Sequence, residues 1–298
     1  MACTGPVRYA PGRRLPNGNR YFWPPCMTTH ENTQACRAGG PMMAAGEDHA
    51  VPIVDMLLSR SGTPVVDSET LITEIQKRVW GALRKGYEYS GPFDESENYL
   101  RSHVFSKIEM GVMYVDLVGS TDMTLELPEE KIATIISSFA QEMAYVVRRY
   151  GGFVLKFVGD AVIAFFAGGD SLRIADTVVE CAKSMITAVK DGINPILNQY
   201  DYPDLRIKVG IDHGRALVVR YGADEARAPV DLIGPVLNIA AKIQSHAKPG
   251  QVLIGIDVYD RLHPARQGSF EKIEWKGTDW KYRSRRTGEI YGVYGYKG

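Results

Sequence analysis

Residues 111–121 read Gly-Val-Met-Tyr-Val-Asp-Leu-Val-Gly-Ser-Thr, and residues 156–166 read Lys-Phe-Val-Gly-Asp-Ala-Val-Ile-Ala-Phe-Phe. Each stretch joins a hydrophobic run of strand length to an aspartate near a glycine, Asp116 in the first and Asp160 in the second. A carboxylate at the end of a buried strand is fixed by the sheet and yet open to solvent, which suits it to hold a hard divalent cation. The two aspartates together predict a two-metal site.

The sequence around these stretches predicts alternating strands and amphipathic helices. A helix that starts at Pro128 has apolar residues at helical spacing, and a hairpin of two strands is expected at 153–157 and 161–166. A helix opening at Ser171, a strand at 205–211, a helix near 234–246, a strand at 251–254 and a hairpin within 270–296 follow. This order predicts an α+β sandwich with a central, mainly antiparallel sheet and helices on one of its faces.

The residues before this dense pattern are expected to be peripheral. Residues 1–66 are rich in Gly, Pro and small polar residues without periodicity, which predicts a disordered or loosely packed tail. Residues 67–105 contain one helical stripe that begins at Ser68 and ends near Gly86. We interpret this part as a helical connector that either packs on the main domain, residues 106–298, or transmits a signal.

The bulk composition excludes several classes of protein. Of the 298 residues, 45% are hydrophobic, which is enough for a substantial core. Because 35 Lys and Arg balance 35 Asp and Glu, the chain lacks the basic field of a nucleic-acid binder. No apolar run approaches the roughly 20 residues of a membrane helix, so no membrane insertion is expected. The four cysteines form no Cys-x-x-Cys pair, and we expect a cytoplasmic protein with small partners.

Two further segments indicate a phosphate-containing ligand. The glycine-containing loop of residues 117–121 follows Asp116 directly, so its backbone N–H groups could approach phosphates that a metal on Asp116 and Asp160 would also bind. Asn238 and Lys242 lie four residues apart, on one face of a predicted helix, and this pair suits a phosphate that gains charge in a transition state. Each feature alone is more often structural, but the combination favours a functional interpretation.

In this order, the segments resemble those of the class III nucleotidyl cyclases, the catalytic domains of adenylate and guanylate cyclases. Four elements within residues 106–296 carry the resemblance: Asp-x-x-Gly at Asp116, Lys-x-x-Gly-Asp at Lys156 to Asp160, Gly-Ile-Asp-His-Gly at 210–214, and Asp-x-x-Gly-x-x-x-Asn at Asp231 to Asn238. The resemblance implies a ferredoxin-like fold, with residues 106–298 as the catalytic domain.

The resemblance also implies a role for each candidate residue. These are the metal ligands Asp116, Asp160 and the Leu117 carbonyl; the phosphate-binding backbone of Val118, Gly119, Ser120 and Thr121; the base-reading pair Lys156 and Asp231; and the catalytic pair Asn238 and Lys242. Two Mg²⁺ or Mn²⁺ ions per site are expected. In the family, the metal ligands come from one protomer and the remaining groups from the other. Since this chain holds both sets, a homodimer with two shared sites is expected.

The base-reading pair favours ATP as the substrate. Adenine offers an acceptor at N1 and a donor at its exocyclic amine, which a Lys donor and an Asp acceptor complement, whereas guanine presents the opposite polarity. We therefore expect an adenylate cyclase, a lyase in which the 3′-hydroxyl attacks the α-phosphate in line and pyrophosphate leaves. The alternatives are a weak or inactive nucleotide-binding signalling module and a cyclase for GTP or a pyrimidine nucleotide.

Two departures from the family pattern motivate the first of these alternatives, the nucleotide-binding signalling module. Position 242 is Lys where the family has Arg, so a point charge replaces a planar bidentate fork. The lysine that binds the triphosphate in the family is also missing from its usual place beside Thr287. Four basic residues near that place could substitute for it, namely Lys281, Arg283, Arg285 and Arg286.

Overall fold

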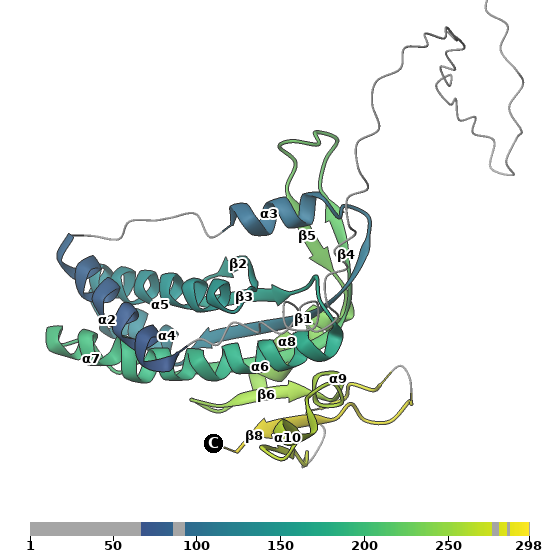
Figure 1. Ribbon diagram of the computed structural model, residues 1–298. Helices are drawn as coiled ribbons and strands as arrows, with labels where there is room; N and C mark the ends of the chain where they lie inside the picture. The colour runs from purple at the N-terminus through teal and green to yellow at the C-terminus, as the bar shows by residue number, and fades with distance from the viewer. Residues whose placement is uncertain (1–66, 86–92, 276–279, 285–286, 298) are drawn as a thin grey trace, which may run out of the picture. The chain divides into compact units, whose positions relative to one another are not determined.

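The computed structural model describes residues 67–85, 93–275, 280–284 and 287–297 (Figure 1). The predicted tail, residues 1–66, and residues 86–92 of the predicted connector therefore lie outside the described residues. Within the described part, no helix combines the length and the apolar character needed to cross a bilayer.

One mixed β-sheet forms the centre of the fold. Its strands are β1 Lys107–Leu117, β2 Phe153–Val158, β3 Ala161–Phe166, β4 Ile207–Arg220, β5 Val230–Ile233, β6 Val252–Gly255, β7 Phe270–Lys272 and β8 Val293–Tyr296. They are arranged in the order β2-β3-β1-β4-β6-β8-β7, and β5 pairs with β4. The described pairs are antiparallel except β4 with β6, which is parallel. The predicted α+β architecture with a mainly antiparallel sheet is confirmed.

Helices connect and cover these strands. The longer ones are α2 Ser68–Lys85, α3 Asp94–Arg101, α5 Glu129–Arg149, α6 Ser171–Thr187 and α8 Pro235–His246. The shorter ones are α4 Ser120–Glu126, α7 Asn194–Leu197, α9 Ile256–Tyr259 and α10 Pro264–Gln267, and a π-helical segment, Ala188–Ile193, follows α6. The sequence patterns missed α3, α4 and β5, and they ended β4 at Ile211 although it continues to Arg220.

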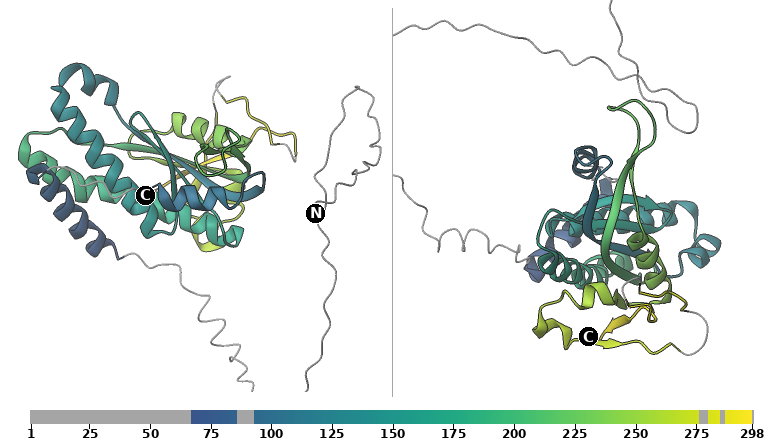
Figure 2. Two further views of the ribbon diagram at one scale, coloured as in Figure 1. Left: turned by 90° about the horizontal axis from the view of Figure 1, so that it is seen from above. Right: turned by 90° about the vertical axis from the view of Figure 1, so that its right-hand side faces the viewer.

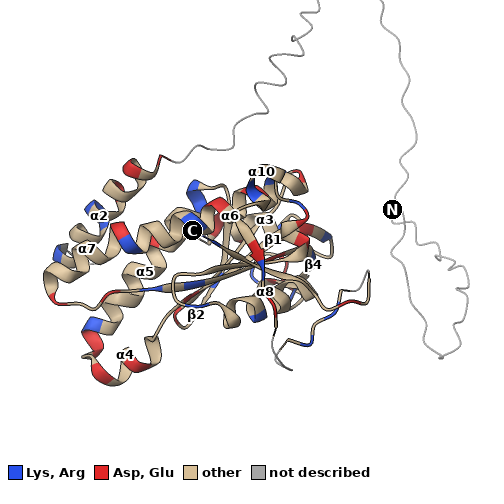
Figure 3. Ribbon diagram, turned by 90° about the horizontal axis from the view of Figure 1, so that it is seen from below, with Lys and Arg blue, Asp and Glu red and all other residues tan. Residues whose placement is uncertain are grey.

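Local signals in the sequence explain the bounds of α5. Pro128 is the N-cap residue, where its missing N–H costs no hydrogen bond, and Glu129 and Glu130 lie in the first turn. Arg148 and Arg149 lie in the last turn. Figure 3 shows in blue and red how basic and acidic residues are distributed over the elements. Acids at the N-terminus and bases at the C-terminus both complement the helix dipole, so the sequence could place this helix accurately.

The central strand β1 is covered on both faces, which corrects the expectation of helices on one face. Met113 and Val115 belong to the core that also contains α2, α5 and α6, whereas Met110 and Val112 belong to a second core with α3 and α8. Side chains alternate between the faces of a strand, so a strand that is apolar at consecutive positions needs cover on both sides. The second face is the one that positions the candidate site.

A glycine allows α8 to lie directly on this second face. A Cβ atom on Gly210 of β4 would lie 2.2 Å from the Gln244 backbone nitrogen and 2.6 Å from the Ala240 carbonyl oxygen. Because these are backbone atoms of the helix, any larger residue would displace α8 from the sheet. The close contact explains why the Gly-Ile-Asp-His-Gly segment begins with glycine.

The helix of the predicted connector, α2, packs on the main domain beside the π-helical segment, α5 and α7 (Figure 2). Its residues Leu71, Ile75 and Val79 are buried in the same core as α5. Arg78 Nη2 donates to Glu142 Oε2 at 2.6 Å, and the Glu142 side chain is only 1% exposed. Burial raises the pKa of Glu142, and Arg78 opposes this rise. Thus α2 supplies the partner of a buried charge in α5.

Candidate active site

The two aspartates of the predicted metal site lie at one end of neighbouring strands. Asp116 is next to the last residue of β1, and its register partner in β3 is Ala161, which directly follows Asp160. Both aspartates are partly exposed. The structure therefore brings Asp116 and Asp160 together at the sheet edge, as the sequence predicted.

The donor set at this edge fits Mg²⁺ or Mn²⁺. Two carboxylates and the carbonyl of Leu117 are hard oxygen ligands of the kind that these ions prefer. The described residues contain no cluster of three or more acidic, His or Cys side chains able to enclose a metal. A metal held by two aspartates would therefore keep open positions for phosphate oxygens and water, which is how Mg²⁺ commonly binds.

The loop after Asp116 turns into a helix, as a phosphate-binding loop would require. Gly119 has a φ of 74°, in the left-handed region that favours glycine, and α4 begins at Ser120. Val118 donates its N–H to the Arg206 carbonyl at 2.8 Å, so this N–H is already used inside the sheet. Gly119, Ser120 and Thr121 remain the better candidates for phosphate contacts.

A cation that the sequence patterns missed lies beside Asp116. Lys208 Nζ is 3.4 Å from Asp116 Oδ2, and the two residues are register partners in β1 and β4. Gln244 Nε2 of α8 donates to the same oxygen at 3.0 Å. Neither contact has a signal in the local sequence, because strand register and helix crossing are set by packing between distant segments.

The predicted base-reading residues form a close ion pair across the second sheet face. Lys156 Nζ of β2 donates to Asp231 Oδ2 of β5 at 2.5 Å, although β2 and β5 are not neighbouring strands. Tyr114 of β1 lies in the same region, since burial and, to a smaller extent, the Asp231 carboxylate raise the pKa of its phenol. The phenol thus stays protonated and can donate a hydrogen bond. The sequence analysis did not single out Tyr114.

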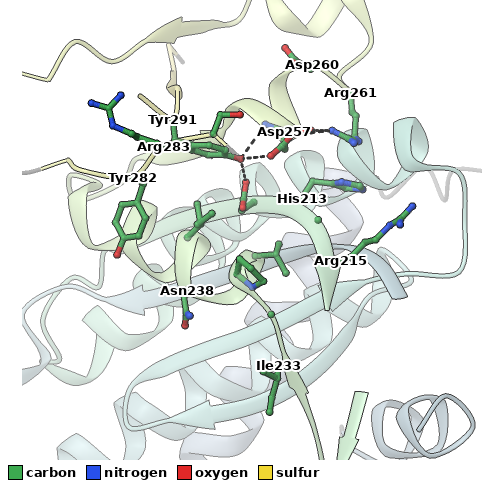
Figure 4. Close-up of a pocket in the computed structure, with 17 residues that line it drawn as sticks. His213, Arg215, Ile233, Asn238, Asp257, Asp260, Arg261, Tyr282, Arg283 and Tyr291 are labelled. Carbon is green, nitrogen blue, oxygen red and sulfur yellow. Dashed lines mark hydrogen bonds and ion pairs between the residues drawn. The ribbon is translucent and has the colours of Figure 1, made fainter. Parts of the chain in front are cut away.

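The predicted catalytic residues of α8 lie on its exposed face. Asn238 and Lys242 are both exposed, and Asn238 lines a cavity of about 1040 Å³ together with Tyr282 and Arg283 (Figure 4). The residues lining this cavity include none of the predicted metal or base ligands. Within one chain, Asn238 is therefore separate both from the metal ligands and from the base-reading pair.

Of the four candidate triphosphate cations, Arg283 lines the same cavity as Asn238. Its Nη1 donates to the Gly288 carbonyl at 2.9 Å, which anchors the side chain at the cavity wall. Lys281 is exposed, and Arg285 and Arg286 lie outside the described residues. Of the four candidates, Arg283 is thus the one that the described residues place at this cavity, which Arg215 and Arg261 also line.

The inner wall of the cavity contains a buried polar cluster. The Tyr291 hydroxyl lies 2.6 Å from Asp212 Oδ1 and 2.9 Å from Asp257 Oδ2. Burial raises the pKa of Asp212 to about 8, and burial together with Arg261 lowers the pKa of His213 to about 4. Since the phenol has one hydrogen for two carboxyl groups, a protonated Asp212 satisfies the cluster. Both Asp212 and His213 lie in the Gly-Ile-Asp-His-Gly segment, which the sequence analysis used only as a pattern.

Known proteins resemble the chain in sequence and in fold. A uridylate cyclase of Rhodovulum sp. (strain MB263) is 28% identical over 189 residues, covering 59% of this chain and 75% of that protein. A cytidylate cyclase of Escherichia coli is 27% identical over 177 residues, covering 57% of this chain and 39% of that protein.

A solved structure shares the fold. The adenylyl cyclase CyaB from P. aeruginosa superposes with a TM-score of 0.54 at 22% identity, covering 64% of this chain and 94% of that one. The model of the adenylate and guanylate cyclase catalytic domain matches residues 104–291. The chain therefore belongs to the adenylate and guanylate cyclase catalytic domain family, the class III nucleotidyl cyclases.

Proposed function

We propose that this chain converts a nucleoside triphosphate into a 3′,5′-cyclic nucleotide and pyrophosphate, with a pyrimidine triphosphate as its preferred substrate. The register of β1 and β3 carries the proposal, because it places Asp116 beside Asp160 at one sheet edge. In the reaction, the ribose 3′-oxygen forms a bond to the α-phosphorus, the bond from the α-phosphorus to pyrophosphate breaks, and the hydroxyl proton leaves to solvent.

One half of the proposed site binds and orients the triphosphate. Asp116 and Asp160 would hold two Mg²⁺ or Mn²⁺ ions, which when bound would lower the pKa of the 3′-hydroxyl and neutralise phosphate charge. The backbone of Gly119 to Thr121 would contact the phosphates. Lys208 Nζ lies 3.4 Å from Asp116 Oδ2, so this ammonium group could also pair with an oxygen of a phosphate bound beside Asp116.

The other half would come from a partner subunit in a homodimer. Asn238 and Arg283 line one cavity, away from the metal ligands of their own chain, and Lys242 is exposed one helical turn beyond Asn238. Across a two-fold axis, each chain would supply metal ligands to one site and these three residues to the other. Asn238 would orient the ribose, while Lys242 and Arg283 would offset charge that develops on the phosphates.

The base site is compatible with a pyrimidine. Cytosine offers an acceptor at N3 beside a donor at its exocyclic amine, so Lys156 and Asp231 complement it as well as they complement adenine. Uracil presents the reverse order, a donor at N3 and an acceptor at its exocyclic oxygen. The Tyr114 hydroxyl can donate or accept and would supply an additional partner near Asp231. The similarity to the uridylate and cytidylate cyclases supports a pyrimidine substrate.

ATP is the second candidate substrate. The polarity of the Lys156–Asp231 pair, whose Nζ and Oδ2 atoms are 2.5 Å apart, favours adenine over guanine and, without a contribution from the Tyr114 hydroxyl, over uracil. This observation does not separate adenine from cytosine, since both bases present the same pattern to the pair.

Product analysis with all four nucleotides tests the substrate. The full chain is incubated with Mn²⁺ and equal concentrations of ATP, GTP, CTP and UTP, and the cyclic products are quantified by mass spectrometry. We expect cyclic UMP or cyclic CMP to form at least about tenfold faster than cyclic AMP. A dominant cyclic AMP product would favour the second candidate, and no product from any nucleotide would exclude a cyclase.

Mixing two inactive variants tests the shared site. Asp160→Ala removes a metal ligand and Asn238→Ala removes a group of the other half, so each homodimer should be inactive. After subunit exchange, half of the dimers are heterodimers with one intact site, which predicts about a quarter of the wild-type activity. A mixture that stays inactive, although exchange is verified by differential tagging, would contradict the shared site.

A further inference from the structure

We propose that Gln244 is a positioning residue for the metal-binding carboxylate of Asp116, and that α8 thereby belongs to both active sites of the dimer. The proposal rests on the proposed function for the roles of Asp116 and Asn238. It concerns a residue of α8 that lies outside the four segments shared with the family.

The geometry fixes Gln244 against Asp116. Gln244 Nε2 donates to Asp116 Oδ2 at 3.0 Å, and Gln244 itself is only partly exposed. Its backbone is held against β4, because Gly210 leaves no room for even a methyl group between strand and helix. Both ends of the contact therefore belong to rigid elements, the end of β1 and the helix packed on the sheet.

The chemistry of the contact suits a metal ligand. A neutral amide orients a carboxylate without cancelling the negative charge that attracts the metal, whereas the Lys208 ammonium group near the same oxygen does offset this charge. Both side-chain contacts described for Asp116 fall on Oδ2, which leaves Oδ1 for a cation. Partners of this kind, which hold a ligand in place, typically contribute 10- to 100-fold to metal affinity.

The two faces of α8 would serve different sites. Gln244 faces the sheet and Asp116, while Asn238 and Lys242 lie on the exposed face of the same helix. In the proposed homodimer, α8 would position a metal ligand of one site and carry Asn238 and Lys242 into the other. A shift of this single helix would then affect both sites at once.

Direct binding of Mn²⁺ tests the positioning role without turnover. Gln244→Met keeps the length of the side chain but removes the donor, and we expect the Kd of the full chain for Mn²⁺, measured by electron paramagnetic resonance, to rise about tenfold or more. Ser245→Ala, on the exposed side of α8, is the matched control and should leave the Kd unchanged. An unchanged Kd in Gln244→Met would overturn the proposal.

A second variant keeps the proposal testable if Gln244→Met does not fold. If Gln244→Met lowers the melting temperature strongly, Gln244→Asn keeps the amide but is one methylene too short to reach Asp116 from the same backbone position. We expect this variant also to weaken Mn²⁺ binding about tenfold. Wild-type Mn²⁺ affinity in a folded Gln244→Asn protein would contradict the proposal in the same way.

The mixed dimer then distinguishes positioning from general damage to α8. In a heterodimer of the Asn238→Ala and Asp160→Ala chains, the Asn238→Ala chain supplies the metal ligands of the intact site. Gln244→Met in that chain should raise the Mn²⁺ concentration for half-maximal activity about tenfold. The same substitution in the Asp160→Ala chain should change this concentration by less than about twofold. Equal effects from both chains would overturn the proposal. If the mixture of Asp160→Ala and Asn238→Ala chains is inactive without any change at Gln244, the shared site is contradicted. The Mn²⁺ affinities of the single variants would still decide the role of Gln244.

Discussion

At the scale of single residues, the candidate site depends on the environments of a few carboxylates. Asp116 is held by a neutral amide and an ammonium group, Asp231 by an ammonium group, and Asp212 by a phenol in a buried cluster. The first two are partly exposed, as ligand-binding groups must be, whereas Asp212 is 1% exposed. We thus propose a binding role for the partly exposed aspartates and a structural role for the buried one.

Asp160, the second proposed metal ligand, should be essential for activity. Asp160→Asn keeps the size of the side chain but removes its charge, so we expect the rate of cyclic nucleotide formation to fall about 10³-fold or more, a loss of roughly 4 kcal/mol. Asp122→Asn, at an exposed position of α4, is the control and should retain activity. Rates measured with saturating Mn²⁺, together with melting curves that match the wild type, would check this. Activity of Asp160→Asn within tenfold of the wild type would contradict the two-metal site.

The hydroxyl of Tyr114 should contribute to recognition of the base. Tyr114→Phe keeps the ring in the second core and removes only the hydroxyl group, which is protonated and lies near Asp231. We expect KM for the preferred nucleotide to rise about tenfold, since a lost hydrogen bond to substrate costs about 1 kcal/mol or somewhat more. Steady-state kinetics with the preferred and the second nucleotide would show this. Equal KM values in both proteins would remove Tyr114 from the base site.

At the scale of elements, the packing of two helices determines how the fold supports the site. The N-terminal helix α2 covers the first core and neutralises Glu142, while α8 covers the second core and contacts Asp116. Each of these contacts joins segments more than sixty residues apart in the sequence. The contribution of each helix can be tested by changing one residue where the helix contacts the rest of the domain.

The ion pair between α2 and α5 should be needed for stability. Arg78→Met leaves Glu142 buried without a charged partner, and it also removes the guanidinium that lies 3.5 Å from the centre of the Tyr145 ring. We expect the free energy of unfolding to fall by about 3–5 kcal/mol, and the double variant Arg78→Met/Glu142→Met to recover most of it. Urea unfolding would measure both values, with the exposed Lys77→Met as the control. A double variant as unstable as the single one would contradict this explanation.

The close contact of β4 and α8 should tolerate no side chain. Gly210→Ala places a methyl group within 2.2–2.6 Å of backbone atoms of α8, so the helix must move away from the sheet. Overpacking of this kind typically costs about 1–3 kcal/mol, and the shift would also separate Gln244 from Asp116. The free energy of unfolding, measured with urea, and the affinity for Mn²⁺ should therefore both fall. In Gly250→Ala, where the added Cβ meets no atom within 4 Å but the φ of 80° strains the backbone, only stability should fall.

At the scale of the whole molecule, the buried polar cluster predicts how stability depends on pH. The pKa of Asp212 is about 8 in the folded chain, and an unfolded aspartate has a pKa of roughly 3.9. Between these values the folded state holds a proton that the unfolded state has released, so stability falls as pH rises towards 8. The pKa of His213 is about 4, below its unfolded value of roughly 6.5, so between pH 6.5 and 4 acidification lowers the contribution of His213 and opposes the gain from Asp212.

The effect of Asp212 is best distinguished from that of His213 between pH 6.5 and 8, where the carboxyl group contributes most of the pH dependence. We expect the free energy of unfolding of the wild type to fall by about 1–2 kcal/mol across this window. Asp212→Asn cannot lose a proton, so its unfolding free energy should stay nearly constant there, whereas the exposed Asp170→Asn should follow the wild type. Urea unfolding at pH 6.5, 7.2 and 8.0 measures the difference. A slope in Asp212→Asn equal to that of the wild type would contradict the role of Asp212.

The sequence by itself determined the elements whose signals are local. The strands β2 and β3 and the helices α5 and α6 lie where the apolar periodicity, the caps and the turn residues place them. That Asp116 and Asp160 each lie at the end of a strand was predictable for the same reason, whereas their adjacency depends on the pairing of β1 with β3. The helix α4 was missed because its seven residues have no buried side chain and hence no apolar stripe.

Only the tertiary structure decided which distant residues meet. The contacts of Asp116 with Lys208 and Gln244 depend on the register of β1 with β4 and on the crossing of α8 over the sheet. The second half of β4 was missed because Asp212 and His213 interrupt its apolar pattern, yet burial in the core keeps them in the strand. Periodicity and capping act over a few neighbouring residues, whereas register, helix crossing and burial of polar groups follow from packing among segments far apart in the chain.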